Sequence, residues 1–152
     1  MKKLIIIVTA LFILNNCGYS PIYSSKNNNF YIKEISEKNR NKLDSKFINN
    51  IKKFSNKDSN NTIELMISSN RKIDIITKDE QGDPTKFQMT ISLNINILKK
   101  NNYEINKTKI FSANFNYNNN TNKFSLKQYE KEIENNLINN VIEKSIIYLS
   151  DL

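Results

Sequence analysis

The single cysteine of this chain, Cys17, lies directly after a short apolar segment at the N-terminus. Lys2 and Lys3 precede that segment, which runs from Leu4 to Leu14. A basic start followed by a short apolar run is the layout of a secretory signal peptide. The run is well short of the roughly 20 apolar residues that a membrane-spanning helix needs. We therefore predict a signal peptide over residues 1–16, with Cys17 as the residue modified after export.

A lone cysteine in this position resembles the lipobox of bacterial lipoproteins, in which the sulfur is diacylated and the cysteine becomes the new N-terminus. The resemblance implies a covalent diacylglycerol and an N-acyl chain such as palmitate on Cys17. Two acyl chains hold a protein stably on a bilayer, whereas one gives marginal binding. Asn15 and Asn16 stand where the lipobox usually has small residues. The alternative is an ordinary buried thiol, because free cysteine is among the most buried residue types.

Side chains that commonly carry out catalysis are scarce. The chain has no histidine, which removes the commonest general base and the commonest nitrogen ligand of zinc. It also has no glycine-rich nucleotide-binding motif. Asp79, Glu80 and Asp83 lie beside Gly82 and Pro84, and they could form a paired-carboxylate or weak calcium site, although these residue types are typical of a solvated turn. We expect no enzyme activity, no metal site and no cofactor besides the lipid.

Basic residues outnumber acidic ones. The chain has 23 lysines and arginines and 15 acidic residues, a net charge of +8, and loss of residues 1–16 leaves +6. Such a surface favours phosphate-bearing partners, although the high asparagine, lysine and isoleucine content also fits an AT-rich coding genome. An ordinary solvated surface is the alternative for any single lysine. Arg71 is the best candidate for bidentate phosphate contact. The candidate lipid-binding residues are Arg71, Lys72, Lys78, Lys99 and Lys100.

The first half of the predicted domain contains one strand and one helix. Residues 30–152 have the size of a single domain, and residues 17–29 link it to the cysteine. Aromatic and branched residues predict a strand over Phe30–Ile35. Apolar residues three to four positions apart then predict an amphipathic helix from about Asn39 to Phe54. The stripe consists of Leu43, Phe47, Ile51 and Phe54.

Three further strands follow. Alternating apolar residues predict a strand from Ile63 to Ile75, a turn over residues 79–84 and a strand over Phe87–Ile97 with one apolar and one polar face. That pattern is typical of an antiparallel sheet covered on one side. After a turn at 99–102, odd-numbered apolar residues predict a strand over 103–117. Lys107 and Lys109 interrupt its parity, so we expect a bulge or twist near Thr108.

The last segment predicts a long helix. Ser125 is a candidate N-cap, Gln128 completes a capping box, and Phe124 and Tyr129 occupy the positions of a hydrophobic staple. The helix should begin at Leu126 and reach nearly to the C-terminus, long enough to cover a sheet. The order β-α-β-β-β-α predicts an α+β fold. In it, a four-stranded, mostly antiparallel or mixed sheet carries both helices on one face.

The segment Cys17-Gly18-Tyr19-Ser20-Pro21-Ile22-Tyr23 resembles the Cys-Gly-(Phe/Tyr)-x-Pro-(Leu/Val)-Tyr opening of the lipopolysaccharide-assembly lipoprotein family, LptE. The family's element order and length are also similar. The resemblance implies a non-enzymatic lipoprotein on the periplasmic face of the outer membrane. Such a protein sits as a plug in the LptD β-barrel and helps to assemble lipopolysaccharide into the outer leaflet. Gly18 agrees with outer-membrane sorting, since the usual inner-membrane retention signal is an aspartate there.

Two other classes of protein remain open. A generic envelope lipoprotein that scaffolds a secretion or pilus complex would share the anchor without binding lipopolysaccharide. A basic nucleic-acid-binding protein with a fortuitous apolar N-terminus would share the charge. In that case Phe111, Phe115 and Tyr117 could stack on bases. Their odd-numbered spacing places them on the predicted core face, which favours packing instead.

Overall fold

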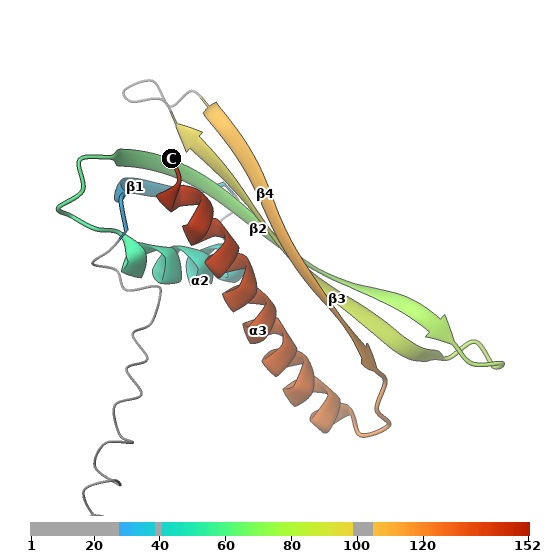
Figure 1. Ribbon diagram of the computed structural model, residues 1–152. Coiled ribbons are helices and arrows are strands. Elements are labelled where there is room, and N and C mark those ends of the chain that lie inside the picture. Colours follow the sequence, from blue (N-terminus) through green and yellow to red (C-terminus); the bar gives the residue numbers. More distant parts are fainter. Residues whose placement is uncertain (1–27, 39–40, 99–104) are drawn as a thin grey trace, which may run out of the picture.

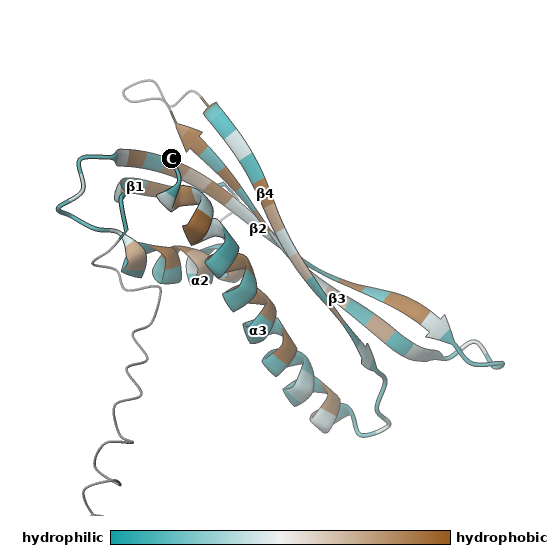
Figure 2. Ribbon diagram, viewed as in Figure 1, coloured by the Kyte–Doolittle hydropathy of each residue, from teal (hydrophilic) through white to brown (hydrophobic). Residues whose placement is uncertain are grey.

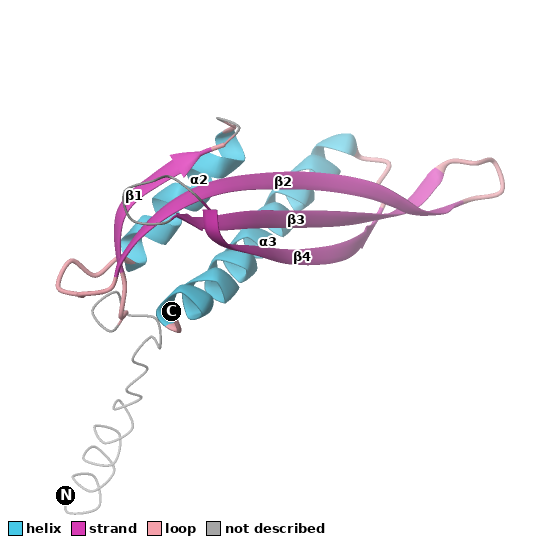
Figure 3. Cartoon of the chain, turned by 90° about the horizontal axis from the view of Figure 1, so that it is seen from above, coloured by secondary structure: helices cyan, strands magenta, loops and turns pink. Residues whose placement is uncertain are grey.

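Four strands form one mixed sheet, and two helices lie on one of its faces (Figures 1 and 3). The computed structural model describes residues 28–38, 41–98 and 105–152. The predictions for the signal peptide, Cys17, Lys99 and Lys100 lie outside the described residues. The sheet order is β1-β2-β3-β4, with β1 parallel to β2 and the other neighbours antiparallel. The predicted α+β architecture is confirmed. The strands are β1 (Tyr31–Glu37), β2 (Thr62–Lys78), β3 (Pro84–Leu98) and β4 (Ile105–Asn118).

The first helix, α2 (Lys42–Ile51), begins a little later than predicted and continues into a 3₁₀ turn, η2 (Lys52–Phe54). Asn41 fixes this start because its side-chain oxygen accepts a hydrogen bond from the backbone N–H of Asp44 at 2.6 Å. Asparagine is among the best N-caps since it satisfies a helix N–H that would otherwise have no partner. The helix turns its apolar face to the sheet, where Phe47 and Ile51 are completely buried.

The core lies between this sheet face and the helices. Alternate side chains of the strands point to the same face, and register brings Ile67 beside Ile95 and Leu93 beside Phe111. The banding in Figure 2 follows this alternation. Each fully buried side chain of this size stabilises the fold by about 1.5–3 kcal/mol. The strand residues with the deepest burial are Leu65, Ile67, Met89, Ile91, Leu93 and Ile95.

The irregularity predicted near Thr108 is present two residues earlier in β4. Thr108 pairs regularly with Asn96, and the register shifts between Ile97 and Leu98, opposite Asn106. Lys109 keeps its place on the helix-covered face because its ammonium group lies 5.9 Å from the centre of the Tyr148 ring. A long lysine stem can cover apolar surface while its charge remains in water. The side chains of β4 can therefore keep alternating between the two sheet faces although Lys109 is charged.

The C-terminal helix, α3 (Lys123–Ser150), begins three residues before the predicted start. Asn122 is the N-cap, and its Oδ1 atom accepts hydrogen bonds from the N–H groups of Phe124 and Ser125, both at 3.1 Å. The predicted capping box and staple are therefore wrong: Ser125 already lies in the first turn, and the Phe124 side chain is 70% exposed. The predicted extent to the C-terminus is confirmed, and 28 residues give a helix about 42 Å long.

None of the helices in the described residues combines the length and apolar character required to cross a bilayer.

Candidate functional site

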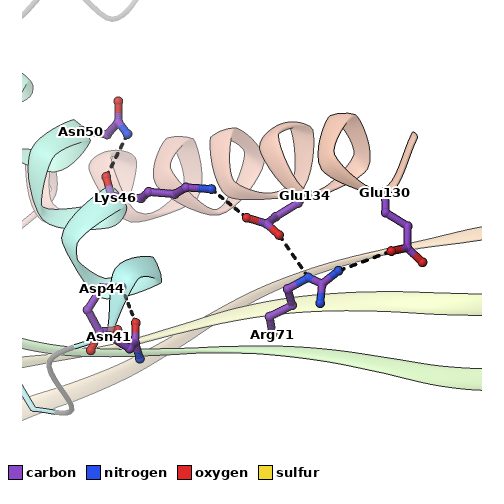
Figure 4. Close-up of polar contacts among 7 residues, drawn as sticks. All are labelled: Asn41, Asp44, Lys46, Asn50, Arg71, Glu130 and Glu134. Carbon is purple, nitrogen blue, oxygen red and sulfur yellow. Dashed lines mark hydrogen bonds and ion pairs between the residues drawn. The ribbon is translucent and has the colours of Figure 1, made fainter. Parts of the chain in front are cut away.

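Arg71 lies on the helix-covered face of β2 and is held by two glutamates of α3 (Figure 4). Its Nε atom is 3.1 Å from Oε2 of Glu134, and its Nη2 atom is 3.8 Å from Oε2 of Glu130. Lys46 of α2 also contacts Glu134, with 2.7 Å between Nζ and Oε1. The Tyr117 hydroxyl of β4 donates to Oε1 of Glu130 at 2.7 Å. These five side chains, the Arg71 network, join α2, α3, β2 and β4.

The Arg71 network is balanced in charge. Lys46 and Arg71 supply two positive charges, and Glu130 and Glu134 supply two negative ones. Burial raises the pKa of the Tyr117 phenol well above its ordinary value, and the hydrogen bond to Glu130 raises it further, while Arg71 opposes both effects. The phenol therefore remains a donor at physiological pH. An anionic ligand of Arg71 would have to compete with two carboxylates already in place.

The structure separates the other predicted lipid-binding residues. Lys72 follows Arg71 in the strand and so points to the opposite sheet face, where its Nζ atom lies 2.9 Å from Oδ1 of Asp74. Lys78 is exposed at the end of β2. Lys99 and Lys100 are outside the described residues. Arg71, Lys72 and Lys78 therefore do not form one patch.

In the acidic turn over residues 79–84, the side chain of Asp79 already forms hydrogen bonds within the turn. Oδ1 of Asp79 accepts from the N–H groups of Gln81 at 3.1 Å and Asp83 at 2.8 Å. Gly82 closes the turn with a φ of +89°, a conformation that glycine adopts at no steric cost. These contacts support the interpretation of this segment as a turn between β2 and β3 rather than a paired-carboxylate site.

A polar hollow opens where β3 begins, β4 ends and α3 starts. Its volume is about 620 Å³, and its lining combines amide and hydroxyl groups with the ammonium group of Lys86. Asn119 fixes the local geometry because its Nδ2 atom donates to the Pro84 carbonyl at 2.7 Å and its Oδ1 atom accepts from the N–H of Asn120 at 2.9 Å. The lining also includes Asn116, Asn118, Ser125, Leu126 and Tyr129.

A second hollow of about 390 Å³ adjoins the start of α3. Its lining consists of Lys123, Phe124, Leu126, Lys127 and Glu130, and Phe124 is the most exposed of the large apolar side chains there. We call Lys86, Lys123, Phe124, Lys127 and Tyr129 the α3-start surface. It combines cations with exposed aromatic rings, a pattern that suits an amphiphilic anion. This surface was not predicted from the sequence because Phe124 was assigned to a hydrophobic staple. The Lys-Phe-x-x-Lys spacing that forms part of it is nevertheless present in the sequence.

In the part of the chain that the structure describes, no helix lies on the opposite face of the sheet (Figure 3). Its side chains are mostly amides and hydroxyls, among them the row Asn70, Ser92 and Ser112 set by strand register. Neighbouring side chains bond across the strands, as Gln88 does when its Nε2 atom donates to Oδ1 of Asn116 at 2.9 Å. This open polar face offers many hydrogen-bonding groups, and among its charged residues Lys72 is paired with Asp74.

Solved structures share this fold. The minor lipoprotein from Acinetobacter baumannii matches with a TM-score of 0.55 and 11% identity, over 78% of this chain and 91% of that chain. Lipoprotein B from Nitrosomonas europaea, an uncharacterized protein solved in solution, matches with a TM-score of 0.57 and 12% identity, over 84% and 86%. No family model matches the sequence, and no curated protein is significantly similar to it. At these identities the likeness establishes the fold that this chain shares with two bacterial lipoproteins.

Proposed function

We propose that this chain is a lipid-anchored envelope protein that acts by binding rather than by catalysis. The observation that carries the proposal is the segment Cys17–Tyr23, which joins a lipobox-like cysteine to the LptE-like opening. The fold supports it, because the A. baumannii and N. europaea structures of the same fold are lipoproteins. More specifically, the protein assembles with an outer-membrane β-barrel of the LptD kind and assists the insertion of lipopolysaccharide into the outer leaflet.

The start of the folded domain supports an anchored arrangement. Asn28 is tied to the end of the molecule where α3 finishes, since its Nδ2 atom donates to the Phe54 carbonyl at 3.0 Å and its Oδ1 atom accepts from the Ser150 hydroxyl at 3.3 Å. Cys17 is 11 residues earlier in the chain, a reach of at most about 40 Å. The β2–β3 hairpin lies at the far end of the domain (Figure 1). An anchored domain therefore presents the hairpin away from the point of attachment.

The two unassigned surfaces fit the two proposed partners. The interior of a large outer-membrane barrel is polar, and the open polar face of the sheet can form hydrogen bonds with such a wall. Lipopolysaccharide combines phosphates with acyl chains, and the α3-start surface combines Lys86, Lys123 and Lys127 with the ring of Phe124. The contacts of lipopolysaccharide with Arg71, Lys72, Lys78, Lys99 and Lys100 stay a prediction from charge.

Copurification from intact envelopes tests the proposal. A tagged full chain should carry acyl label on Cys17 and bring down a large outer-membrane barrel, and its depletion should lower surface lipopolysaccharide. The Cys17→Ala variant, which keeps the folded domain, is the control and should lose the label. An acylated chain without a barrel and with normal surface lipopolysaccharide would leave the generic scaffolding lipoprotein as the function. An unlabelled cytoplasmic chain would favour the nucleic-acid-binding alternative.

A further inference from the structure

One edge of β2 is covered over only part of its length. β1 pairs with β2 from Thr62 to Ile67, and beyond that point no strand of the described residues lies on this side of β2 (Figure 3). The next residues belong to the regular β2–β3 ladder as far as Ile75, where a bulge at Ile76 interrupts it. The sheet therefore has a regular, uncovered edge next to the end of β1.

The hydrogen bonds at the covered end show which backbone groups face this edge. The Ile67 carbonyl accepts from the N–H of Lys38 at 2.9 Å. The N–H of Ser69 donates to Oδ1 of Asp44 at 2.6 Å, and the Ser69 carbonyl accepts from Nδ2 of Asn41 at 3.4 Å. Because alternate residues of a strand turn their backbone groups to the same edge, the groups that follow on this edge belong to Arg71, Ile73 and Ile75. Within the described residues nothing bonds to them there.

The segment has few of the features that normally block an edge. Native edges are protected by prolines, by bulges, by charged side chains or by a covering element. This segment does carry charges, Arg71, Lys72 and Asp74, but each is already paired with an opposite charge. Here the cover by Asn41 and Asp44 stops at Ser69, and the bulge begins only after Ile75. Ile75 is 49% exposed, next to Phe87 in the register. Apolar side chains and unpaired backbone groups are thus exposed together.

We propose that this edge pairs with the same edge of a second copy of the chain, antiparallel and centred on Ile73. Ile73 then faces Ile73 of the other copy, and Arg71 faces Ile75 on either side. These three pairs have outward backbone groups in both copies, and each exchanges two hydrogen bonds, six in all. The proposal concerns the free protein and does not rest on the proposed barrel partner.

The charges along this edge favour the register centred on Ile73 and favour a second copy of the chain as the partner. On the open face, Lys72 of each copy lies opposite Asp74 of the other, in pairs where no backbone bonds form and side chains are closest. Centring on Arg71 would place two arginines opposite each other and would need the backbone groups of Ser69, which are already bonded. Centring on Ile75 would draw in the bulge at Ile76. The edge is therefore complementary to itself in one register.

Disulfide trapping tests the register, with the full chain in mild detergent and with Cys17→Ala as the background. In the proposed pair the Cα atoms of the two copies of residue 73 are about 5.5 Å apart, within the range for a disulfide. The two copies of residue 75 are about 14 Å apart, four residues along the strand. Ile73→Cys should give a covalent dimer on oxidation, whereas the matched variant Ile75→Cys should not. Absence of the Ile73→Cys dimer, or equal trapping of both variants, would overturn the proposal.

Charge exchange tests the pairing by a second route. By symmetry, Lys72→Asp or Asp74→Lys alone creates two like-charge contacts and should weaken dimerisation about tenfold in sedimentation equilibrium. The double variant restores opposite charges and should return to within about threefold of the parent. Lys57→Asp makes the same change of charge in the exposed loop after η2 and should have no effect on dimerisation. A parent chain that is monomeric at all concentrations, or a double variant as weak as the single ones, would contradict the pairing.

Discussion

Arg71 and Glu134 are joined by an ion pair, with 3.1 Å between Nε and Oε2, that ties the middle of β2 to the first half of α3. The arginine side chain is 37% exposed and the glutamate 21%, so the pair is partly shielded from solvent. Glu134 also receives Lys46 from α2. Arg71 was predicted to contact lipid, but in the structure it is bound by two glutamates of α3. We therefore expect its substitution to lower the free energy of unfolding first.

A double-mutant cycle on Arg71→Gln and Glu134→Gln should show a coupling free energy of about 1 kcal/mol in urea unfolding, because the pair is partly buried and belongs to a network. The matched control is Lys72→Gln with Asp74→Asn. That pair is also within ion-pair distance but lies exposed on the other face, so its coupling should be smaller. Equal coupling in the two cycles would show that the Arg71 network adds nothing beyond an exposed contact.

Asp44→Ala should destabilise the domain by about 2–3 kcal/mol, measured by urea or thermal unfolding. Asp44 is completely buried, and its Oδ1 atom accepts hydrogen bonds from both the N–H and the hydroxyl of Ser69. Removing the carboxylate leaves a buried backbone donor without a partner. Asp58→Ala, at an exposed loop position, is the control and should change stability by less than about 0.5 kcal/mol. Similar losses in both variants would contradict the role given to Asp44.

Tyr117→Phe should change the pH dependence of stability in a defined direction. Burial and Glu130 raise the phenol pKa above its ordinary value of 10.0. In the unfolded chain the phenol therefore loses its proton at a lower pH than in the folded protein. Its contribution to stability is complete below pH 10 and falls as the pH rises above that value.

The measurement for Tyr117→Phe is the urea midpoint from pH 8 to pH 11.5. The parent should lose stability more steeply than the variant above pH 10, and the two curves should run parallel below it. Tyr129→Phe is the control, because that ring is 44% exposed. Parallel curves over the whole range would show that the Tyr117 phenol titrates alike in the folded and unfolded chains.

Sequence periodicity predicted the elements and their faces because burial repeats with the period of a helix or a strand. It placed Leu65, Ile91 and Val141 in the core, where they are buried. The start of α3 was missed because Asn122 and Ser125 are both good caps, and the local sequence does not show which one lies where β4 ends. The partners of Arg71 were also missed. They are Glu130 and Glu134, about 60 residues away in the chain, and no local pattern connects residues so far apart.

The last prediction separates the two candidate lipid-binding sets. Lys123→Glu with Lys127→Glu should weaken binding of lipopolysaccharide to the full chain about tenfold or more at low salt, because two charges beside Phe124 are reversed. Arg71→Glu with Lys72→Glu should weaken it less, since Arg71 already faces two carboxylates and Lys72 faces Asp74. Lys42→Glu with Lys57→Glu, at exposed positions on α2 and the loop after η2, controls for net charge. Higher salt should narrow the differences, because it screens exposed charges. Full binding by the Lys123/Lys127 variant would remove the α3-start surface from the proposed function. A greater loss in the Arg71/Lys72 variant, with its urea unfolding midpoint unchanged, would return the contact to β2.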